Sequence, residues 1–146
     1  MDSLLKVSII VPTLNEAQGL TETLTQIQQL FPYELVVSDG GSRDGTLEIA
    51  EEFTENVVKG STGRALQMNA GARVANGDIF LFLHADSRIE PASYEKMLHF
   101  LGSSEKKIGG AFSLCIDSDK WSLRLITELA NLRSKYFGMA YGDQAF

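Results

Sequence analysis

The sequence has few of the cysteines that stabilise small secreted proteins and few of the long apolar segments that anchor a chain in a membrane. Its 146 residues include one cysteine, Cys115, which cannot form an internal disulfide and suits a reducing compartment. The longest unbroken apolar run covers only residues 79–83, whereas a membrane-spanning helix needs about 20 apolar residues. Residues 1–6 carry neither a basic region nor a long apolar stretch, which argues against a secretory signal. We therefore expect a cytoplasmic protein that is not an integral membrane protein.

Basic residues are also few, because 13 Lys and Arg against 19 Asp and Glu give a formal net charge of −6. No basic block is present to displace counterions from a polyanion, so we expect no nucleic-acid partner. The same balance means that a phosphate ligand would need a local cation, either a basic side chain or a bound metal. With 44% hydrophobic and 22% charged residues, the composition is that of a globular protein, and the length suits a single domain over residues 1–146.

Apolar, β-branched segments alternate with segments of helical periodicity along most of the chain. Strands are expected at residues 6–11, 34–38, 56–59 and 79–83, and helices near residues 16–30, 44–53, 64–75 and 91–101. This alternation implies right-handed βαβ crossovers, and therefore an α/β fold with a mostly parallel sheet flanked by helices. A further strand is expected over residues 111–116, with Cys115 in the core, and a helix over residues 121–132.

The residues that follow the expected strands are unusually polar. They are Thr13, Asn15, Glu16, Asp39, Ser42, Asp44, His84 and Asp86. Parallel sheets bind ligands at the carboxyl ends of their strands, so these side chains are the candidate site. One or two carboxylates, of which Asp86 is the strongest candidate, commonly hold Mg²⁺ or Mn²⁺ together with substrate phosphates. Arg64 at the start of its helix would add a positive charge. Together these features predict a cradle for a nucleotide diphosphate.

Two familiar phosphate-binding motifs are absent. The chain contains no Gly-x-x-x-x-Gly-Lys-Ser/Thr, and the first strand is not followed by Gly-x-Gly-x-x-Gly. Plainer interpretations also stand beside the functional ones. Thr13 and Glu16 fit a helix capping box, and Asp44 fits an N-cap. Gln67 and Asn69 are expected to pack or to bond the backbone rather than a ligand.

Four motifs in order resemble glycosyltransferases of family 2, which have the GT-A fold. The motifs are VPTLNE (11–16), SDGGSRDGT (38–46), GRALQMNAGA (63–72) and FLHAD (82–86). With the later YGDQ (141–144), they are similar in particular to the bacterial subgroup of arsenosugar-biosynthesis-type glycosyltransferases. The resemblance implies a GT-A, Rossmann-like sheet that forms the nucleotide-sugar-binding half of the enzyme. It also implies a donor that is a nucleotide-diphosphate sugar, with UDP or GDP, and an acceptor hydroxyl that it does not identify.

The resemblance assigns roles to individual positions. Pro12, Thr13 and Glu16 would line the base and ribose, Asp39 would bond the base, and Arg64 would lie near the diphosphate. Asp86 matches the last acid of the family's Asp-x-Asp motif and would meet the divalent metal, Mg²⁺ or Mn²⁺. The full predicted donor-binding set is Pro12, Thr13, Asn15, Glu16, Asp39, Gly40, Ser42, Asp44, Arg64 and Asp86.

The sequence departs from the family pattern at two places. His84 stands where the Asp-x-Asp motif has its first acid, so it is the second candidate metal ligand. The Glu-Asp pair that supplies the family's catalytic base would lie beyond Phe146, so we expect a chain shortened at its C-terminus. Asp143 is then the remaining candidate base for an inverting, metal-assisted transfer to the acceptor.

Other functions remain open on sequence alone. Absence of the usual base favours a non-catalytic nucleotide-binding or assembly module as the alternative. A nucleotidyltransferase is disfavoured because residues 12–16 offer no basic group to hold a triphosphate. The apolar stripe expected on the helix over residues 121–132 is either core or the interface of a homodimer.

Overall fold

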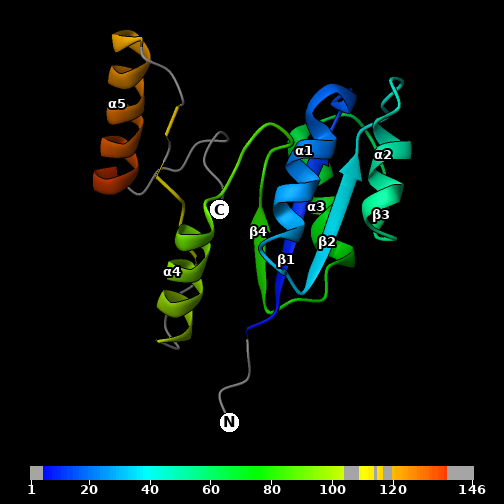
Figure 1. The fold of residues 1–146 in the computed structure, drawn as a ribbon, viewed down its shortest axis with the longest axis horizontal. Helices are drawn as coiled ribbons and strands as arrows, with labels where there is room; N and C mark the ends of the chain where they lie inside the picture. Colours follow the sequence, from blue (N-terminus) through cyan, green and yellow to red (C-terminus); the bar gives the residue numbers. More distant parts are fainter. Residues whose placement is uncertain (1–4, 104–108, 114, 117–119, 138–146) are drawn as a thin grey trace. The chain divides into compact units, whose positions relative to one another are not determined.

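The computed structural model describes residues 5–103, 109–113, 115–116 and 120–137. Its contacts divide the chain into two compact units, one within residues 1–107 and one within residues 108–146. The first unit holds four strands, β1 (Val7–Thr13), β2 (Glu34–Asp39), β3 (Val57–Lys59) and β4 (Ile79–Phe82). It also holds four helices, α1 (Ala17–Gln28), α2 (Thr46–Phe53), α3 (Arg64–Val74) and α4 (Pro91–Gly102) (Figure 1). The second unit contains helix α5 (Trp121–Phe137).

The four strands form one sheet in the order β3-β2-β1-β4, and every pairing is parallel. This confirms the predicted α/β fold with a parallel sheet. Right-handed crossovers that lead outward from β1 to β3 and then back to β4 place their helices on opposite faces. In Figure 1, α1 accordingly lies on one face of the sheet and α3 on the other.

The core is centred on β1, whose seven residues are all buried. Helix α1 contributes Leu20, Leu24 and Ile27, which recur at helical spacing and are at most 1% exposed. Burying a side chain of this size stabilises the fold by about 1.5–3 kcal/mol. β1, which pairs with both β2 and β4, is therefore the buried centre of the sheet. The loops at the carboxyl ends of the strands start from this centre.

A hydrogen-bond network joins the strands at the opposite, amino-terminal edge of the sheet. The Ser8 hydroxyl donates to Glu34 Oε1 at 2.5 Å, and it accepts the Gly77 amide at 2.8 Å. The Asn76 amide donates to the same Glu34 oxygen. Burial alone would raise the pKa of Glu34, but these hydrogen bonds outweigh it and hold the pKa below its ordinary value. A Cβ at Gly77 would lie 2.7 Å from the Lys6 carbonyl oxygen, so only glycine permits this approach.

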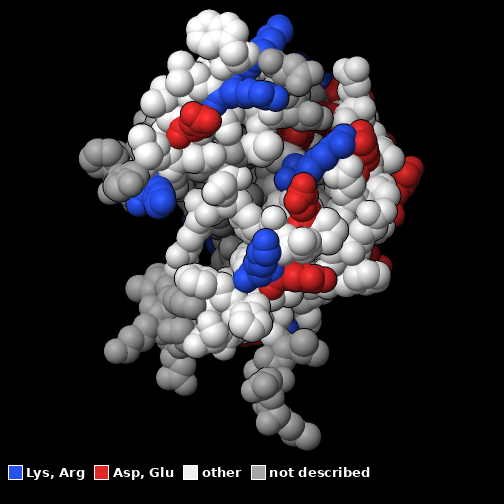
Figure 2. Space-filling view, turned by 60° about the vertical axis from the view of Figure 1, so that its left-hand side comes forward, with Lys and Arg blue, Asp and Glu red and all other residues white. Residues whose placement is uncertain are grey.

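Exposed charges of both signs are mixed on the surface. Lys59 pairs with Glu51 at 3.2 Å and Arg88 with Glu22 at 2.5 Å, and all four side chains are largely exposed. Figure 2 shows the same mixing of basic and acidic side chains on one face of the molecule. Such exposed pairs contribute little to stability. Within the described residues, no helix is long and apolar enough to cross a membrane.

The second unit corrects two expectations. The predicted strand over residues 111–116 is wrong for its described residues, 111–113 and 115–116, which have no strand structure. An alternating pattern can define a face, but a strand also needs a neighbouring edge to pair with. Cys115 is exposed rather than in the core. Helix α5 is present as predicted, and its apolar side chains Trp121, Leu125, Ile126, Leu129 and Leu132 are 48–77% exposed.

Candidate functional site

The carboxyl ends of β1 and β2 finish side by side. Thr13 and Asp39 are the last residues of their strands and face each other in the ladder. On the other side of β1, the Leu83 amide donates to the Ile10 carbonyl at 3.0 Å, which continues the β4 pairing beyond the strand. The segments that follow β1, β2 and β4 therefore leave the sheet at one edge. We call this edge, with residues 13–16, 39–46 and 84–87, the rim.

Asp39 organises the loop that follows β2. Its Oδ1 accepts the amides of Gly41 and Ser42, each at 2.9 Å. Its Oδ2 accepts the Thr13 hydroxyl at 3.2 Å and the Ser42 hydroxyl. Burial would raise the pKa of Asp39, but the hydrogen bonds from Ser42, Gly41 and Thr13 hold it below its ordinary value. The carboxylate, 1% exposed, is thus a fixed negative charge at the head of the rim.

Asn15 joins the loop after β1 to the loop after β2. Its amide donates to the Ser42 hydroxyl at 2.8 Å, and its Oδ1 accepts the Arg43 amide at 2.9 Å. Asn15 has φ 57°, a left-handed conformation in which asparagine is among the better tolerated residues. Gly41 at φ 101° makes the matching turn after Asp39. The two loops therefore form one bonded structure.

Asp44 and Thr46 connect the starts of two helices. Asp44 accepts the Ala17 amide at 3.1 Å and, from Thr46, the amide at 3.2 Å and the hydroxyl at 2.5 Å. The pKa of Asp44 is held below its ordinary value, chiefly by the Thr46 hydroxyl. The predicted N-cap role of Asp44 is wrong, because the N-cap of α2 is Gly45. Asp44 lies one position earlier and accepts the Thr46 amide from there. It also caps α1, which the sequence did not indicate.

The predicted capping box of Thr13 and Glu16 is wrong. Thr13 belongs to β1, and its hydroxyl donates a hydrogen bond to Asp39. The Glu16 side chain makes no capping hydrogen bond on α1. The Glu16 amide instead donates to the Thr46 hydroxyl at 2.9 Å. Thr46, fully buried, is a rim residue that the sequence reasoning missed. The signal available was its place at the end of the SDGGSRDGT motif.

Two carboxylates from two other segments, Asp86 and Asp44, lie within electrostatic reach of Glu16. Burial raises the pKa of Glu16, and the negative charges of Asp86 and then Asp44 raise it further. Asp86 itself is exposed. Its loop is anchored by the Thr23 hydroxyl, which donates to the Ala85 carbonyl at 2.6 Å in a buried contact. Thr23 is a second residue that sequence reasoning did not single out.

The remaining predicted residues have different degrees of exposure. Pro12 is buried within β1, and Gly40 is buried where its backbone meets Gln67. Arg64 is the first residue of α3 and is exposed, and His84 is partly exposed. Gln67 bonds the backbone, as predicted, but the carbonyls are those of distant strands. Asp143 lies outside the described residues.

Comparison with known proteins identifies the family. Residues 8–143 match the family model described as Glycosyl transferase family 2. The chain belongs to this family. Its sheet and flanking helices match GT-A glycosyltransferase structures, so the predicted GT-A fold is confirmed. The narrower resemblance to arsenosugar-biosynthesis-type enzymes stays a prediction.

Individual relatives are considerably longer than this chain. The chain is 38% identical over 108 residues to a PGL/p-HBAD biosynthesis glycosyltransferase of Mycobacterium tuberculosis, covering 67% of this chain and 42% of that protein. It is 31% identical over 118 residues to the dolichol-phosphate mannosyltransferase of Pyrococcus furiosus, covering 74% and 34% respectively. Among solved structures, glucosyl-3-phosphoglycerate synthase of M. tuberculosis matches with 25% identity and a TM-score of 0.53, over 60% of this chain and 36% of that one. That crystal structure contains Mn²⁺, UDP-glucose and phosphoglyceric acid.

A divalent cation at the rim of this family 2 domain would need ligands from outside the protein as well. Among the described residues, no group of three or more His, Cys, Asp and Glu side chains is arranged to hold a metal ion. Burial raises the pKa of Glu16, and the negative charges of Asp86 and then Asp44 raise it further, so carboxylates gather around Glu16. Mg²⁺ typically binds through one or two carboxylates plus substrate phosphates. The rim carboxylates therefore fit a divalent cation only where a bound phosphate supplies further ligands.

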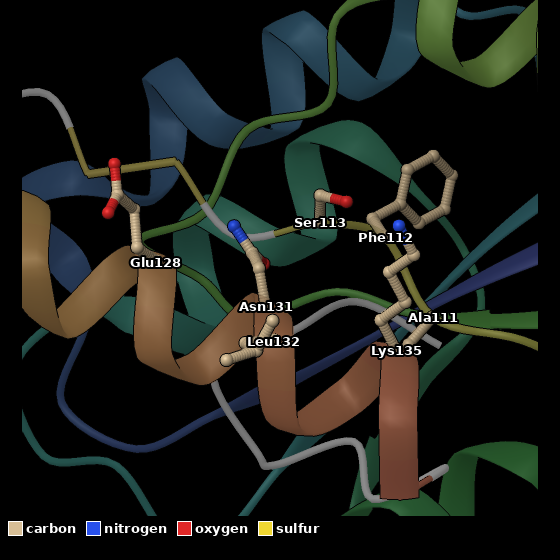
Figure 3. A pocket seen from close by; sticks show the side chains of 7 residues that line it. All are labelled: Ala111, Phe112, Ser113, Glu128, Asn131, Leu132 and Lys135. Atoms are coloured by element: carbon tan, nitrogen blue, oxygen red, sulfur yellow. The ribbon is translucent and has the colours of Figure 1, made fainter.

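The second unit contains an open pocket of about 630 Å³. Residues 111–113 line it on one side, and α5 contributes Glu128, Asn131, Leu132 and Lys135 (Figure 3). Its lining includes none of the rim residues. The rim thus remains the candidate site, because it gathers the charges and the fixed hydrogen-bonding groups.

Proposed function

We propose that this chain is the donor-binding part of a glycosyltransferase that transfers a sugar from a nucleotide-diphosphate sugar to an acceptor hydroxyl. The observation that carries the proposal is the rim, in which the loops after β1 and β2 are tied together by Asp39, Ser42 and Asn15. A pre-formed loop pair of this kind suits a rigid, polar ligand, because little further ordering is needed on binding.

The nucleoside would occupy the part of the rim built around Asp39. A base that carries an N–H group would replace the Ser42 hydroxyl as the donor to Asp39 Oδ2. Thr13, Asn15 and Glu16 would lie beside the ribose, with Pro12 and Gly40 forming the floor. Asp39 is ionised at neutral pH because its pKa is held low, so it would accept this hydrogen bond in its charged form.

The diphosphate would lie toward Arg64 and Asp86. Asp86 would hold Mg²⁺ or Mn²⁺, with His84 as the second candidate ligand. When bound, the metal would offset the charge that builds on the departing diphosphate. Arg64 would supply a fixed positive charge to the same group, next to the N-terminus of α3. Transfer with inversion also needs a base for the acceptor hydroxyl, and Asp143 stays the predicted candidate.

The comparison structures support UDP and Mn²⁺ as the first ligands to test. The synthase of M. tuberculosis, 25% identical to this chain, binds Mn²⁺ with UDP-glucose. The acidic composition of this chain agrees with a need for a metal beside a diphosphate. GDP is the second nucleotide to test, because an aspartate that accepts from a base edge does not by itself distinguish uracil from guanine.

The proposal is tested by titrating UDP and GDP, each with and without Mn²⁺, into the native protein and into Asp86→Ala by calorimetry. We expect metal-dependent binding of one nucleotide to the native protein and a loss of at least tenfold in Asp86→Ala. The matched control is Asp78→Ala, since Asp78 precedes β4 whereas Asp86 follows it. Absence of binding by every nucleotide would reject the proposal. Binding without sugar transfer to any acceptor would favour the alternative, a non-catalytic nucleotide-binding module.

A further inference from the structure

Helix α3 approaches the sheet through an unusual pair of residues. Its buried residues are Gln67 and Gly71, one turn apart, whereas a helix on a sheet normally buries an apolar stripe. A Cβ at Gly71 would lie 2.5 Å from Ile10 Cγ2 and 3.6 Å from Ser38 Cβ. Glycine therefore allows α3 to lie against β1 and β2 at short range. This close approach brings Gln67 to the carboxyl ends of both strands.

The Gln67 carboxamide bridges these two strands. Its Nε2 donates to the Thr13 carbonyl at 2.5 Å and lies 3.4 Å from the Ser38 carbonyl, in a buried position. Carbonyl oxygens only accept, so the amide nitrogen must face them. The carboxamide also presses on Gly40, where a Cβ would lie 2.9 Å from Gln67 Cδ and Nε2. Gln67 thus contacts the last residue of β1 and the residues on either side of Asp39, the last residue of β2.

The contact with Thr13 is not required to satisfy the backbone. The Thr13 carbonyl already accepts the Gly40 amide at 2.9 Å. A buried carboxamide loses its hydration on folding and must recover it through hydrogen bonds. An apolar side chain of equal length would fill the same space without that cost. The second hydrogen bond to the Thr13 carbonyl, from Gln67, therefore indicates that Gln67 positions the strand ends rather than satisfying an unpaired backbone group.

We propose that Gln67 is a positioning residue for the nucleotide, an inference that rests on the proposed function. It holds Thr13, whose hydroxyl donates to Asp39, and Ser38, which precedes Asp39. The carboxamide thereby fixes the Asp39 carboxylate relative to the loop of Asn15 and Glu16. Gln67 needs no contact with the ligand, because its effect reaches the ligand through Asp39.

The test compares Gln67→Met, which keeps the length and removes the donor, with Thr54→Val. Thr54 donates its hydroxyl to the Leu35 carbonyl at 2.8 Å, so this control also removes a side-chain donor from a β2 carbonyl, but near the start of the strand. We expect Gln67→Met to weaken UDP binding in the presence of Mn²⁺ by about tenfold, which corresponds to the loss of one well-placed hydrogen bond. Thr54→Val should lower the melting temperature and leave the UDP affinity within twofold of native.

A pH profile separates positioning from general destabilisation. In Gln67→Glu, the ionised carboxylate faces two carbonyl oxygens, whereas the protonated acid can donate to one of them. The UDP affinity of this variant, relative to native at each pH, should therefore recover as the pH falls from 8 to 6. The relative affinity of Gln67→Met should not change with pH. A flat profile for Gln67→Glu would contradict the inference.

The outcomes distinguish this inference from the proposed function. If the native protein binds neither UDP nor GDP, the proposed function fails and the inference fails with it. If the native protein binds UDP and folded Gln67→Met binds it within twofold, the inference alone is overturned. Should Gln67→Met not melt cooperatively, the pH profile of Gln67→Glu decides the inference on its own.

Discussion

The Thr46 hydroxyl, at the first residue of α2, accepts the backbone amide of Glu16, the residue that precedes α1, at a distance of 2.9 Å. The same hydroxyl donates to Asp44. One buried side chain thus links two helix starts that are separated by 30 positions in the sequence. We therefore expect this link to contribute to the stability of the rim.

Replacing Thr46 by valine should destabilise the protein by about 1–3 kcal/mol, because it leaves the Glu16 amide without its acceptor and Asp44 without one donor. Urea unfolding followed by circular dichroism measures the change. The matched control is Thr25→Val on the exposed face of α1, where the hydroxyl bonds only the Thr21 carbonyl. We expect the control to stay within about 0.5 kcal/mol of native. Equal effects of the two substitutions would argue against the link.

Two glycines within helices, Gly71 and Gly19, should respond in opposite directions to alanine. At Gly71 the new Cβ would lie 2.5 Å from Ile10 Cγ2, so Gly71→Ala should destabilise the fold by about 1–3 kcal/mol. At Gly19 nothing lies within 4 Å, so Gly19→Ala should stabilise it by about 0.5–1 kcal/mol. Chemical denaturation of both variants tests the pair. A stabilising Gly71→Ala would mean that α3 lies farther from β1 than described.

Acid should weaken the hydrogen-bond network at the amino-terminal edge of the sheet. The pKa of Glu34 is lower in the folded protein than its ordinary value of 4.5. The unfolded chain therefore takes up this proton first, and the stability that Glu34 contributes is present above pH 4.5 and is lost as the pH falls through its folded pKa. Glu34→Gln should be less stable than native at pH 7 and should lose less stability below pH 4.5. Urea titrations across this range, with the exposed Glu95→Gln as control, measure both effects.

Protonation of Glu16 should weaken the binding of a divalent cation at the rim. Burial and the charges of Asp86 and Asp44 raise the Glu16 pKa above 4.5, so this carboxyl becomes neutral at a higher pH than an ordinary glutamate. The affinity for Mn²⁺ in the presence of UDP should fall as the pH is lowered toward 4.5, beginning at a higher pH than for an ordinary glutamate, and Glu16→Gln should show a smaller dependence than native. Calorimetry at several pH values would check this. An unchanged pH dependence in Glu16→Gln would exclude Glu16 as its source.

Self-association should depend on the apolar face of α5. The homodimer indicated by the sequence stays a prediction, and exposed apolar side chains of this kind favour association. Leu129→Glu, which places a charge where a leucine is 57% exposed, should shift the protein toward monomer in sedimentation-velocity experiments at increasing concentration. Ser122→Glu on the same helix is the control. A native chain that stays monomeric at every concentration would contradict the prediction.

Much of the fold could be predicted because its signals are local. β-branched runs and helical spacing predicted each strand and helix of the first unit to within a few residues. The expected end of the first strand at Val11 was too early, because proline normally interrupts a ladder. In the structure β1 continues through Pro12 to Thr13, paired with β2 to the end. The pattern over residues 111–116 misled for another reason, since alternation is present but the described residues 111–113 and 115–116 pair with no strand of the described part of the chain.

The site was predicted as a set of residues but not as a network. The motifs placed Asp39, Asn15 and Asp44 at one edge of the sheet, as the structure does. Their hydrogen-bond partners depend on the register of β1 against β2, which brings Thr13 opposite Asp39 and cannot be deduced from either segment alone. The capping-box prediction failed for this reason, because the Thr13 hydroxyl found a nearer acceptor across the ladder. The reach of Gln67 likewise depends on the glycine that lets α3 approach the sheet.

The strand order has a consequence for where a ligand can enter. From β1 the chain moves outward through β2 to β3, and it then returns across the sheet to place β4 on the other side of β1. The direction of winding therefore reverses between β1 and β4. Open parallel sheets bind ligands outside the carboxyl ends of their strands at such a topological switch point. The Thr13–Glu16 segment lies at the end of one of these strands and Asp86 follows the other, and α1 ties the two together through the bond from Thr23 to the Ala85 carbonyl.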